Sequence, residues 1–262
     1  MLIVLSFVIS LLVSSLSTNS YTCSDYVDSN TSLPCIEVRS CDDSSNMASI
    51  TINTLSSGAG KGQSVATVGI CYYKDSLQLT YNVKNQNYFP TEGVYSDCNS
   101  AIWNEDTVEA FIAPGFDSNQ IKEPKCYGEF DISPYGTKWQ GSIYNKNLNG
   151  TSMASSLYDC DDTISSSTIY RDDNSWSASI KIDFSLLNCP HNCPTCDVNS
   201  VTTTPLSLYR VNFYRINELS SVADDNNCNL DTSACEYLAW SPNLHSPPSF
   251  HQPLYFGTLI IV

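Results

Sequence analysis

Twelve cysteines, all downstream of an apolar N-terminal run, constrain this chain more than any other feature. The run MLIVLSFVISLLV gives way to Ser, Thr and Asn, which predicts a secretory signal over residues 1–20, with Thr18 and Ser20 as small residues at a cleavage site. It is short for a membrane span of roughly 20 residues, so we expect cleavage rather than anchoring. An even number of cysteines in an exported chain indicates up to six disulfides. We therefore expect a secreted protein with no membrane association after cleavage.

Three short motifs fit an extracellular chain. Residues 189–196 (CPHNCPTC) combine Cys and His as zinc sites do, but exported cysteines are usually oxidised, so disulfides are favoured over zinc. Residues 58–62 (GAGKG) lack the full spacing of a phosphate-binding loop and indicate a flexible loop. Sequons at Asn30 and Asn149 predict a glycoprotein.

The net charge of −15 argues against nucleic acid and anionic membranes as partners, because both require a basic face. Acidic residues occur in adjacent pairs beside expected loops: Glu105/Asp106, Asp161/Asp162, Asp172/Asp173 and Asp224/Asp225. Solvated surface charge is the favoured interpretation, with structural calcium as the alternative. None of the pairs has EF-hand spacing, and no cofactor is required.

Short segments of alternating apolar and polar residues recur along the chain. Such segments, separated by Gly, Pro, Asn and Asp, are typical of half-buried strands. The expected strands are 68–72, 77–83, 107–113, 127–133, 176–184, 209–216 and 255–261. No segment sustains a helical period over three turns, so the fold class is all-β, an antiparallel β-sandwich with disulfide-pinned loops.

This pattern divides the chain into three parts. Residues 1–20 are the signal, 21–65 a Cys/Ser-rich N-terminal segment, and 66–262 the sandwich domain. The Pro/Cys-rich stretch 188–205 interrupts the strand pattern and indicates an insertion loop.

The sequence carries little that points to catalysis. Its three histidines, His191, His245 and His251, lie in no recognisable triad context. Glu109 with Glu129 or Asp131 could form a glycosidase pair, an interpretation supported only by their acidity.

The tryptophans are more informative. Trp103 and Trp240 flank expected strands, where aromatic faces suit the apolar faces of sugar rings, although core packing is the alternative for both. Trp176 precedes an apolar strand and is expected in the core.

Five segments, in order over about residues 66–262, resemble family 9-like carbohydrate-binding modules. They are 102–114 (IWNEDTVEAFIAP), 127–133 (YGEFDIS), 176–184 (WSASIKIDF), 209–215 (YRVNFYR), and 240–242 (WSP) followed by 250–257 (FHQPLYFG). The resemblance implies a β-sandwich related to DOMON domains, sugar binding at glycan chain ends, and bound calcium in some members. It also implies work beside glycoside hydrolases, so the implied partners are a polysaccharide or oligosaccharide and a secreted glycoside hydrolase.

The same resemblance implies roles for particular residues. Trp103 and Trp240 would clamp a sugar ring, and Glu109 would accept hydrogen bonds from its hydroxyls. Arg210 and Arg215 would donate to sugar oxygens, but strand alternation places them on opposite faces, so only one is expected to make contact. Asn212 and His251 are lesser candidates.

Three positions depart from the family pattern. Tyr209 replaces a tryptophan, Asp183 a proline and Gln252 an arginine. The predicted function is a secreted, non-catalytic carbohydrate-binding protein that recognises polysaccharide or glycan ends, in the context of polysaccharide breakdown. The alternatives are a glycoside hydrolase or its accessory, and a structural extracellular or coat protein that has lost sugar binding. The test between binding and a purely structural role is whether Trp103 and Trp240 face each other across a cleft.

Overall fold

The computed structural model describes residues 22–26, 33–42, 47–86, 93–160, 164–172, 174–197, 201–219, 228 and 234–262. The expected signal, the Asn30 sequon and the Asp161/Asp162 and Asp224/Asp225 pairs lie outside these ranges. Within them, no helix has the length and apolarity needed to cross a bilayer.

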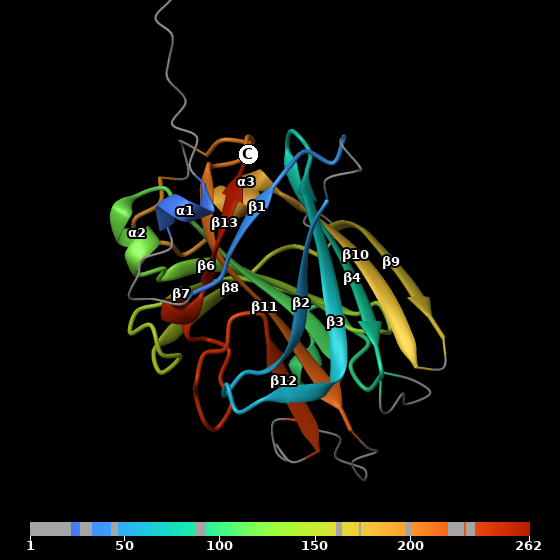
Figure 1. The fold of residues 1–262 in the computed structure, drawn as a ribbon. Helices are drawn as coiled ribbons and strands as arrows, with labels where there is room; N and C mark the ends of the chain where they lie inside the picture. Colours follow the sequence, from blue (N-terminus) through green and yellow to red (C-terminus); the bar gives the residue numbers. More distant parts are fainter. Residues whose placement is uncertain are drawn as a thin grey trace, which may run out of the picture.

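The described strands form two layers of a β-sandwich (Figure 1). The first layer contains, in spatial order, β8 (Met153–Leu157), β7 (Lys138–Asn145), β6 (Cys126–Ile132), β5 (Thr107–Pro114) and β11 (Leu208–Glu218). The second contains β2 (Ala48–Leu55), β3 (Lys61–Tyr72), β4 (Ser76–Lys84), β10 (Ser175–Asp183) and β9 (Ile164–Arg171). These neighbours pair antiparallel, which confirms the all-β sandwich expected from the alternating pattern.

Three further strands complete the sheet. β12 (Cys235–Ala239) pairs with both β11 and β2 and so joins the layers at one edge. β13 (Gly257–Ile261) pairs antiparallel with β11 and parallel with β1 (Cys35–Val38). The described helical elements are all short: α1 (Cys23–Tyr26), η2 (Ile102–Asn104), α2 (Ser118–Lys122), α3 (Phe184–Asn188) and η4 (Pro253–Tyr255).

The main apolar core fills the space between the two layers. In β10, Trp176, Ala178, Ile180 and Ile182 are buried while the intervening residues are partly exposed, as their alternation predicts. Burial of each large aliphatic side chain contributes roughly 1.5–3 kcal/mol, so this core is the main source of stability.

Three strands of the first layer, β5, β6 and β11, are buried on both faces, unlike the strands of the second layer. Val108, Ala110 and Ile112 of β5 enter the core between the layers, and Glu109 and Phe111 point to the opposite face. A second apolar cluster covers that outer face, where Phe250 and Phe256 of the chain leading to β13 pack over the strands. The outer face therefore holds polar side chains that are largely buried.

The N-terminal segment is part of the sandwich. β2 pairs with β3 along its length, and β3 runs through residue 65, so the domain boundary expected between residues 65 and 66 falls inside a strand. β2 pairs with the next strand along the chain, β3, and at the layer junction with the distant β12.

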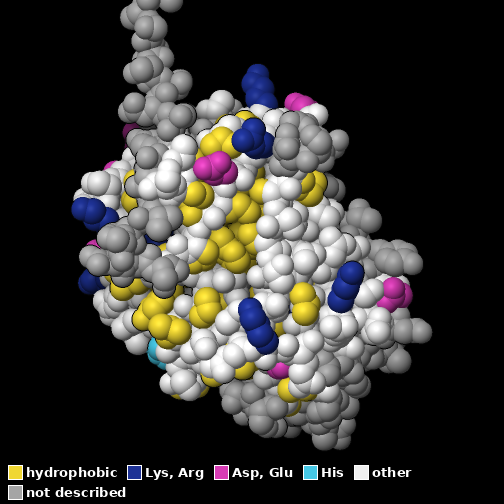
Figure 2. Space-filling model, in the orientation of Figure 1, with side chains coloured by type: hydrophobic (Ala, Val, Ile, Leu, Met, Phe, Trp, Pro, Cys, Tyr) yellow, Lys and Arg dark blue, Asp and Glu magenta, His cyan; other side chains and the backbone are white. Residues whose placement is uncertain are grey.

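All twelve cysteines are paired, as the exported-chain argument predicts. The disulfides are Cys23–Cys35, Cys41–Cys71, Cys98–Cys160, Cys126–Cys193, Cys189–Cys196 and Cys228–Cys235. The cysteines of segment 189–196 therefore lie in disulfides, not in a thiolate zinc site. On the face shown in Figure 2, the Lys and Arg side chains are dispersed rather than gathered into a basic patch.

Candidate functional site

A cleft of about 460 Å³ opens on the outer face of the first layer. Its polar lining consists of Glu109, Glu129, Ser155, Ser249 and His251. Its size is within the usual range for a small-molecule site.

Aromatic rings form much of the remaining wall. They are Trp103, Phe111, Trp139, Tyr237 and Phe250. Trp103, carried by η2, is 37% exposed and packs edge-to-face on Trp139, with ring centroids 5.9 Å apart. An exposed tryptophan fixed in orientation by a buried one offers a ready apolar surface to a ligand.

Stacked rings hold the segment that covers the cleft. Phe250 stacks on Tyr214 with ring centroids 4.0 Å apart, and the Tyr214 hydroxyl donates to the Phe250 carbonyl at 2.9 Å. Asn212 Nδ2 donates to the Tyr214 hydroxyl and to the Ser241 carbonyl, both at 2.8 Å. The cleft is thus preformed by packing and hydrogen bonds.

Three carboxyl groups, the carboxyl triad of Glu109, Glu129 and Asp131, gather on this face. Glu109 is directly opposite Asp131 across β5 and β6, and Glu129 is opposite Phe111. Glu109 and Glu129 line the cleft, whereas Asp131 is fully buried and is paired in register with Trp139 of β7. Among the described residues, Glu109 Oε1, Glu129 Oε2 and both Asp131 carboxyl oxygens are buried and have no hydrogen-bond donor.

Burial controls the protonation of the triad. It raises the pKa of Glu109 to about 8. Burial together with the neighbouring carboxyls raises the pKa values of Glu129 and Asp131 well above the ordinary range. In the ligand-free protein at neutral pH, these groups are therefore held largely as neutral carboxylic acids.

His251 is fixed against the same face. Its Nδ1 lies 2.8 Å from the Tyr127 hydroxyl, and its Nε2 lies 3.9 Å from Glu129 Oε2, which is too far for a direct hydrogen bond. Burial lowers the pKa of His251 to about 4, so the ring is neutral at pH 7. It can take part in hydrogen bonding without bringing a positive charge to the cleft.

Comparison with solved structures decides the fold family. A Bacteroides uniformis protein to which carbohydrate binding is ascribed matches 88% of this chain and 100% of its own, with a TM-score of 0.61 and 16% identity. A family 9 carbohydrate-binding module of Caldicellulosiruptor kristjanssonii, solved with glucose, matches 87% of this chain and 96% of its own, with a TM-score of 0.51 and 11% identity. This chain has a CBM9-like fold.

Sequence comparisons add less. No protein-family model matches the chain. An "Extracellular protein" of Arthroderma benhamiae is 27% identical over 158 residues, which cover 57% of this chain and 62% of that protein. The chain thus spans less than two thirds of this relative.

The structure brings some of the expected contact residues of the CBM9-like fold together and separates others. Trp103, Glu109 and His251 line the cleft. Trp240 is not among its described lining; its ring packs against Phe213, with centroids 5.9 Å apart, beside the core between the layers. The aromatic pair at the cleft is therefore Trp103 with Trp139, and the expected face-to-face clamp of Trp103 and Trp240 is absent from the described cleft.

Arg210 also lies away from the cleft lining. Its Nε donates to the carbonyls of Phe256 and Gly257, each at 3.2 Å, and its Nη1 donates to the Ile121 carbonyl at 2.6 Å. These bonds tie β11 to the chain entering β13 and to α2, which is a structural role.

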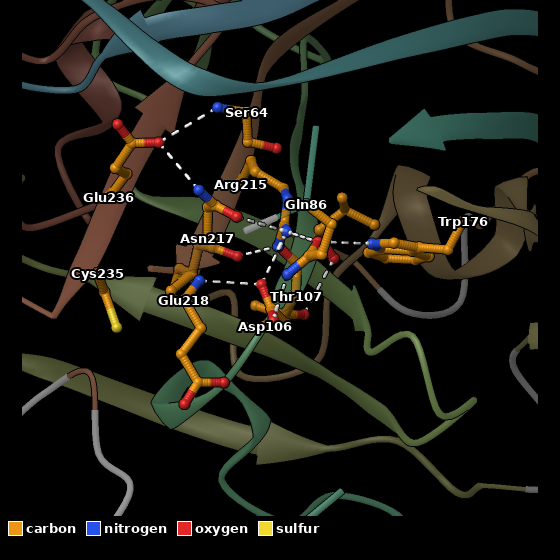
Figure 3. A network of polar contacts seen from close by, with 12 residues as sticks. Ser64, Gln86, Asp106, Thr107, Trp176, Arg215, Asn217, Glu218, Cys235 and Glu236 are labelled. Carbon is orange, nitrogen blue, oxygen red and sulfur yellow. Dashed lines mark hydrogen bonds and ion pairs between the residues drawn. The ribbon is translucent and has the colours of Figure 1, made fainter. Parts of the chain in front are cut away.

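Arg215 lies on the opposite face of β11 from Arg210, as the alternation predicts, and is fully buried. Figure 3 shows it among Gln86, Asp106 and Asn217. Its Nη2 forms an ion pair with Asp106 Oδ1 at 2.7 Å and also donates to Gln86 Oε1. Trp176 Nε1 donates to the same Gln86 oxygen at 3.2 Å. This network joins the two layers from within and leaves Arg215 no access to a ligand in the cleft.

No group of three or more His, Cys, Asp or Glu side chains within the described ranges could hold a metal ion. Asp106 is occupied by Arg215 and Gln86, and Asp172 caps the turn to Ser175. Burial raises the pKa of Glu105 to about 7.

The sequence alone does not predict that Trp139 lines the cleft. It predicts a role for Glu129 only as the partner of Glu109 in a glycosidase pair. Trp139 follows a turn and lies in β7, whose polar and small residues give only a weak strand pattern; the tryptophan itself is the one signal. Only the strand register, Trp139 opposite Asp131, reveals its place at the cleft.

Proposed function

We propose that this chain is a secreted protein that binds carbohydrate in the cleft between Trp103 and the 248–251 segment, without transforming it. The observation that supports this most strongly is that an exposed tryptophan, Trp103, and two carboxyl groups, those of Glu109 and Glu129, line one cleft. A sugar ring has apolar C–H faces and hydroxyl donors, so it can stack on the tryptophan while its hydroxyls donate hydrogen bonds to the carboxyl groups.

The comparisons support the same proposal. One solved structure of this fold holds glucose, and another belongs to a protein to which carbohydrate binding is ascribed. Secretion is supported by the extracellular relative and the complete set of disulfides. We extend the proposal to polysaccharide or glycan ends and to a role beside a secreted glycoside hydrolase.

The test is a binding screen with the secreted protein against a glycan array and insoluble cellulose, xylan and β-glucan. The Trp103→Ala variant should lose the binding, whereas Tyr73→Ala, which removes an aromatic residue of similar exposure outside the cleft, should keep it. Absence of binding to every glycan by the folded protein would contradict the proposal and favour a purely structural role. Addition of the protein to a glycoside hydrolase reaction on the bound polysaccharide then tests the wider role.

A second candidate function is glycoside hydrolysis. It is favoured by a specific observation: Glu109 and Glu129 both line the cleft, and burial raises the pKa of Glu109 to about 8, which suits a general acid. Release of reducing sugar that disappears in Glu109→Gln would establish this function in place of binding alone.

A further inference from the structure

The described lining of the cleft contains acidic groups but no Lys or Arg. Its titratable side chains are Glu109, Glu129, Tyr237 and His251, with Asp131 buried behind them. His251 is the only one of basic type, and its Nδ1 is already engaged with the Tyr127 hydroxyl. A ligand in this cleft therefore meets carboxyl groups without a competing fixed cation.

The triad also lacks the partners that buried carboxyls normally have. Glu109 is 2% and Glu129 6% exposed, yet Oε1 of the first and Oε2 of the second receive no hydrogen bond from the described residues. A buried acceptor without a donor costs roughly 1–3 kcal/mol, and more if it is charged. Both residues also line the cleft, so a ligand there can approach their carboxyl groups.

We infer that the cleft selects a sugar residue bearing a protonated amine, such as a β-1,4-linked glucosaminyl unit, over the neutral sugar of the same linkage and over a uronic acid. This inference rests on the proposed function. An ammonium group brings three N–H donors and a positive charge to one point, whereas a hydroxyl brings a single neutral donor. Charge-assisted hydrogen bonds are about twice as strong as neutral ones.

The protonation state of the triad gives the inference a second signature. Burial raises the pKa of Glu109 to about 8, so the carboxyl group is neutral before the ligand binds. A bound ammonium group lowers the pKa of this carboxyl, which then ionises. The proton passes from the carboxyl to solvent, and a carboxylate–ammonium pair remains. A neutral sugar does not lower the pKa of the carboxyl group. A uronate brings a second negative charge beside the ionised carboxylate.

The experiment is calorimetric titration at pH 6, where the amine is already largely an ammonium in solution, and at physiological salt, with three tetrasaccharides of one linkage. Cellotetraose, tetra-N-acetylchitotetraose and chitotetraose differ only at carbon 2, which carries a hydroxyl, a neutral amide or an amine. We expect chitotetraose to bind at least about tenfold more tightly than cellotetraose, the ratio that one charge-assisted bond in place of a neutral one gives. Its heat should vary with the ionisation enthalpy of the buffer, which reports proton release.

Two variants distinguish an amine preference caused by the cleft from general attraction of a cation to an acidic protein. Glu109→Gln, which is close in shape to the protonated acid, should bring the chitotetraose to cellotetraose ratio close to one; Glu129→Gln provides the same test if the first misfolds. Glu123→Gln removes an exposed carboxylate that pairs with Lys125 and should leave the ratio unchanged.

The possible failures are distinguishable. If cellotetraose binds as tightly as chitotetraose, or if Glu123→Gln lowers the ratio as much as Glu109→Gln, the amine preference is overturned while carbohydrate binding stands. If none of the three ligands binds and the glycan screen is also empty, the proposed function itself is wrong.

Discussion

Glu109 of β5 and Asp131 of β6 occupy directly opposed positions on neighbouring antiparallel strands, with both side chains buried on the cleft face. Like charges in opposed positions destabilise a sheet, and no described cation offsets this pair. In the ligand-free protein this repulsion is reduced because the carboxyl groups are held in their neutral acid form. The strand pairing thus links stability, protonation and ligand binding at one place.

The first prediction concerns the pH dependence of stability. The pKa of Glu109 is about 8 in the folded protein and near 4.5 when unfolded, so the folded state binds more protons and its stability falls as pH rises through this window. Between pH 6.5 and 9, Glu109→Gln should lose less unfolding free energy than the unmodified protein, by on the order of 1–2 kcal/mol.

Urea unfolding at the two pH values measures this difference. His251 does not contribute over this range, because burial lowers its pKa to about 4. Glu105 and Glu218, whose pKa values burial raises to about 7, contribute equally to both proteins. The control, Glu123→Gln, should behave like the unmodified protein. An equal change of unfolding free energy with pH in Glu109→Gln and in the unmodified protein would show that Glu109 is not held protonated.

The second prediction concerns Arg215. Arg215→Lys keeps the charge but cannot reproduce the fork that reaches Asp106, Gln86 and the Thr107 carbonyl. We expect a loss of roughly 1.5–3 kcal/mol in unfolding free energy, the worth of a hydrogen bond to a charged group. Sugar affinity of the folded variant should be unchanged. A loss of sugar affinity with an unchanged unfolding free energy would instead indicate that Arg215 takes part in sugar binding.

The third prediction ranks the disulfides. Cys126–Cys193 closes a loop of 67 residues and Cys228–Cys235 one of 7. In the chain-entropy model, replacing both cysteines of a pair by serine should cost about 4 kcal/mol for the long loop and about 2 kcal/mol for the short one. Chemical denaturation of the two double variants tests the order, and a larger cost for the short loop would show that native-state packing dominates.

Much of the fold could be predicted from the sequence because strand alternation is a local property. The faces of β5 and β10 and the opposed placement of Arg210 and Arg215 all follow from the two-residue period. The sequence does not predict β2, although Ile50 and Ile52 alternate within it, because it lies in a segment dominated by Ser, Asp and Cys. Its structure depends on pairing with β3 and β12.

The cleft could be predicted only in part. Glu109 was identified, but its burial depends on the 248–256 segment folding over the strands, which no local pattern shows. Trp103 and Trp240 have similar sequence settings, yet one lines the cleft and the other packs against Phe213. That difference is fixed by strand register and by the path of the chain between β12 and β13.

The central claim is that sugar occupies the cleft beside Trp103 and Trp139. The protein has four tryptophans, and only these two are in the described cleft lining; Trp176 is bonded to Gln86 and Trp240 packs against Phe213. The most direct measurement is a two-dimensional NMR titration that follows the four indole N–H signals, assigned by single Trp→Phe variants, as the best ligand of the glycan screen is added. We predict that the Trp103 and Trp139 signals shift in a saturable way while those of Trp176 and Trp240 stay in place. A shift of Trp240 with Trp103 unmoved, or no shift with saturating ligand, would contradict the account.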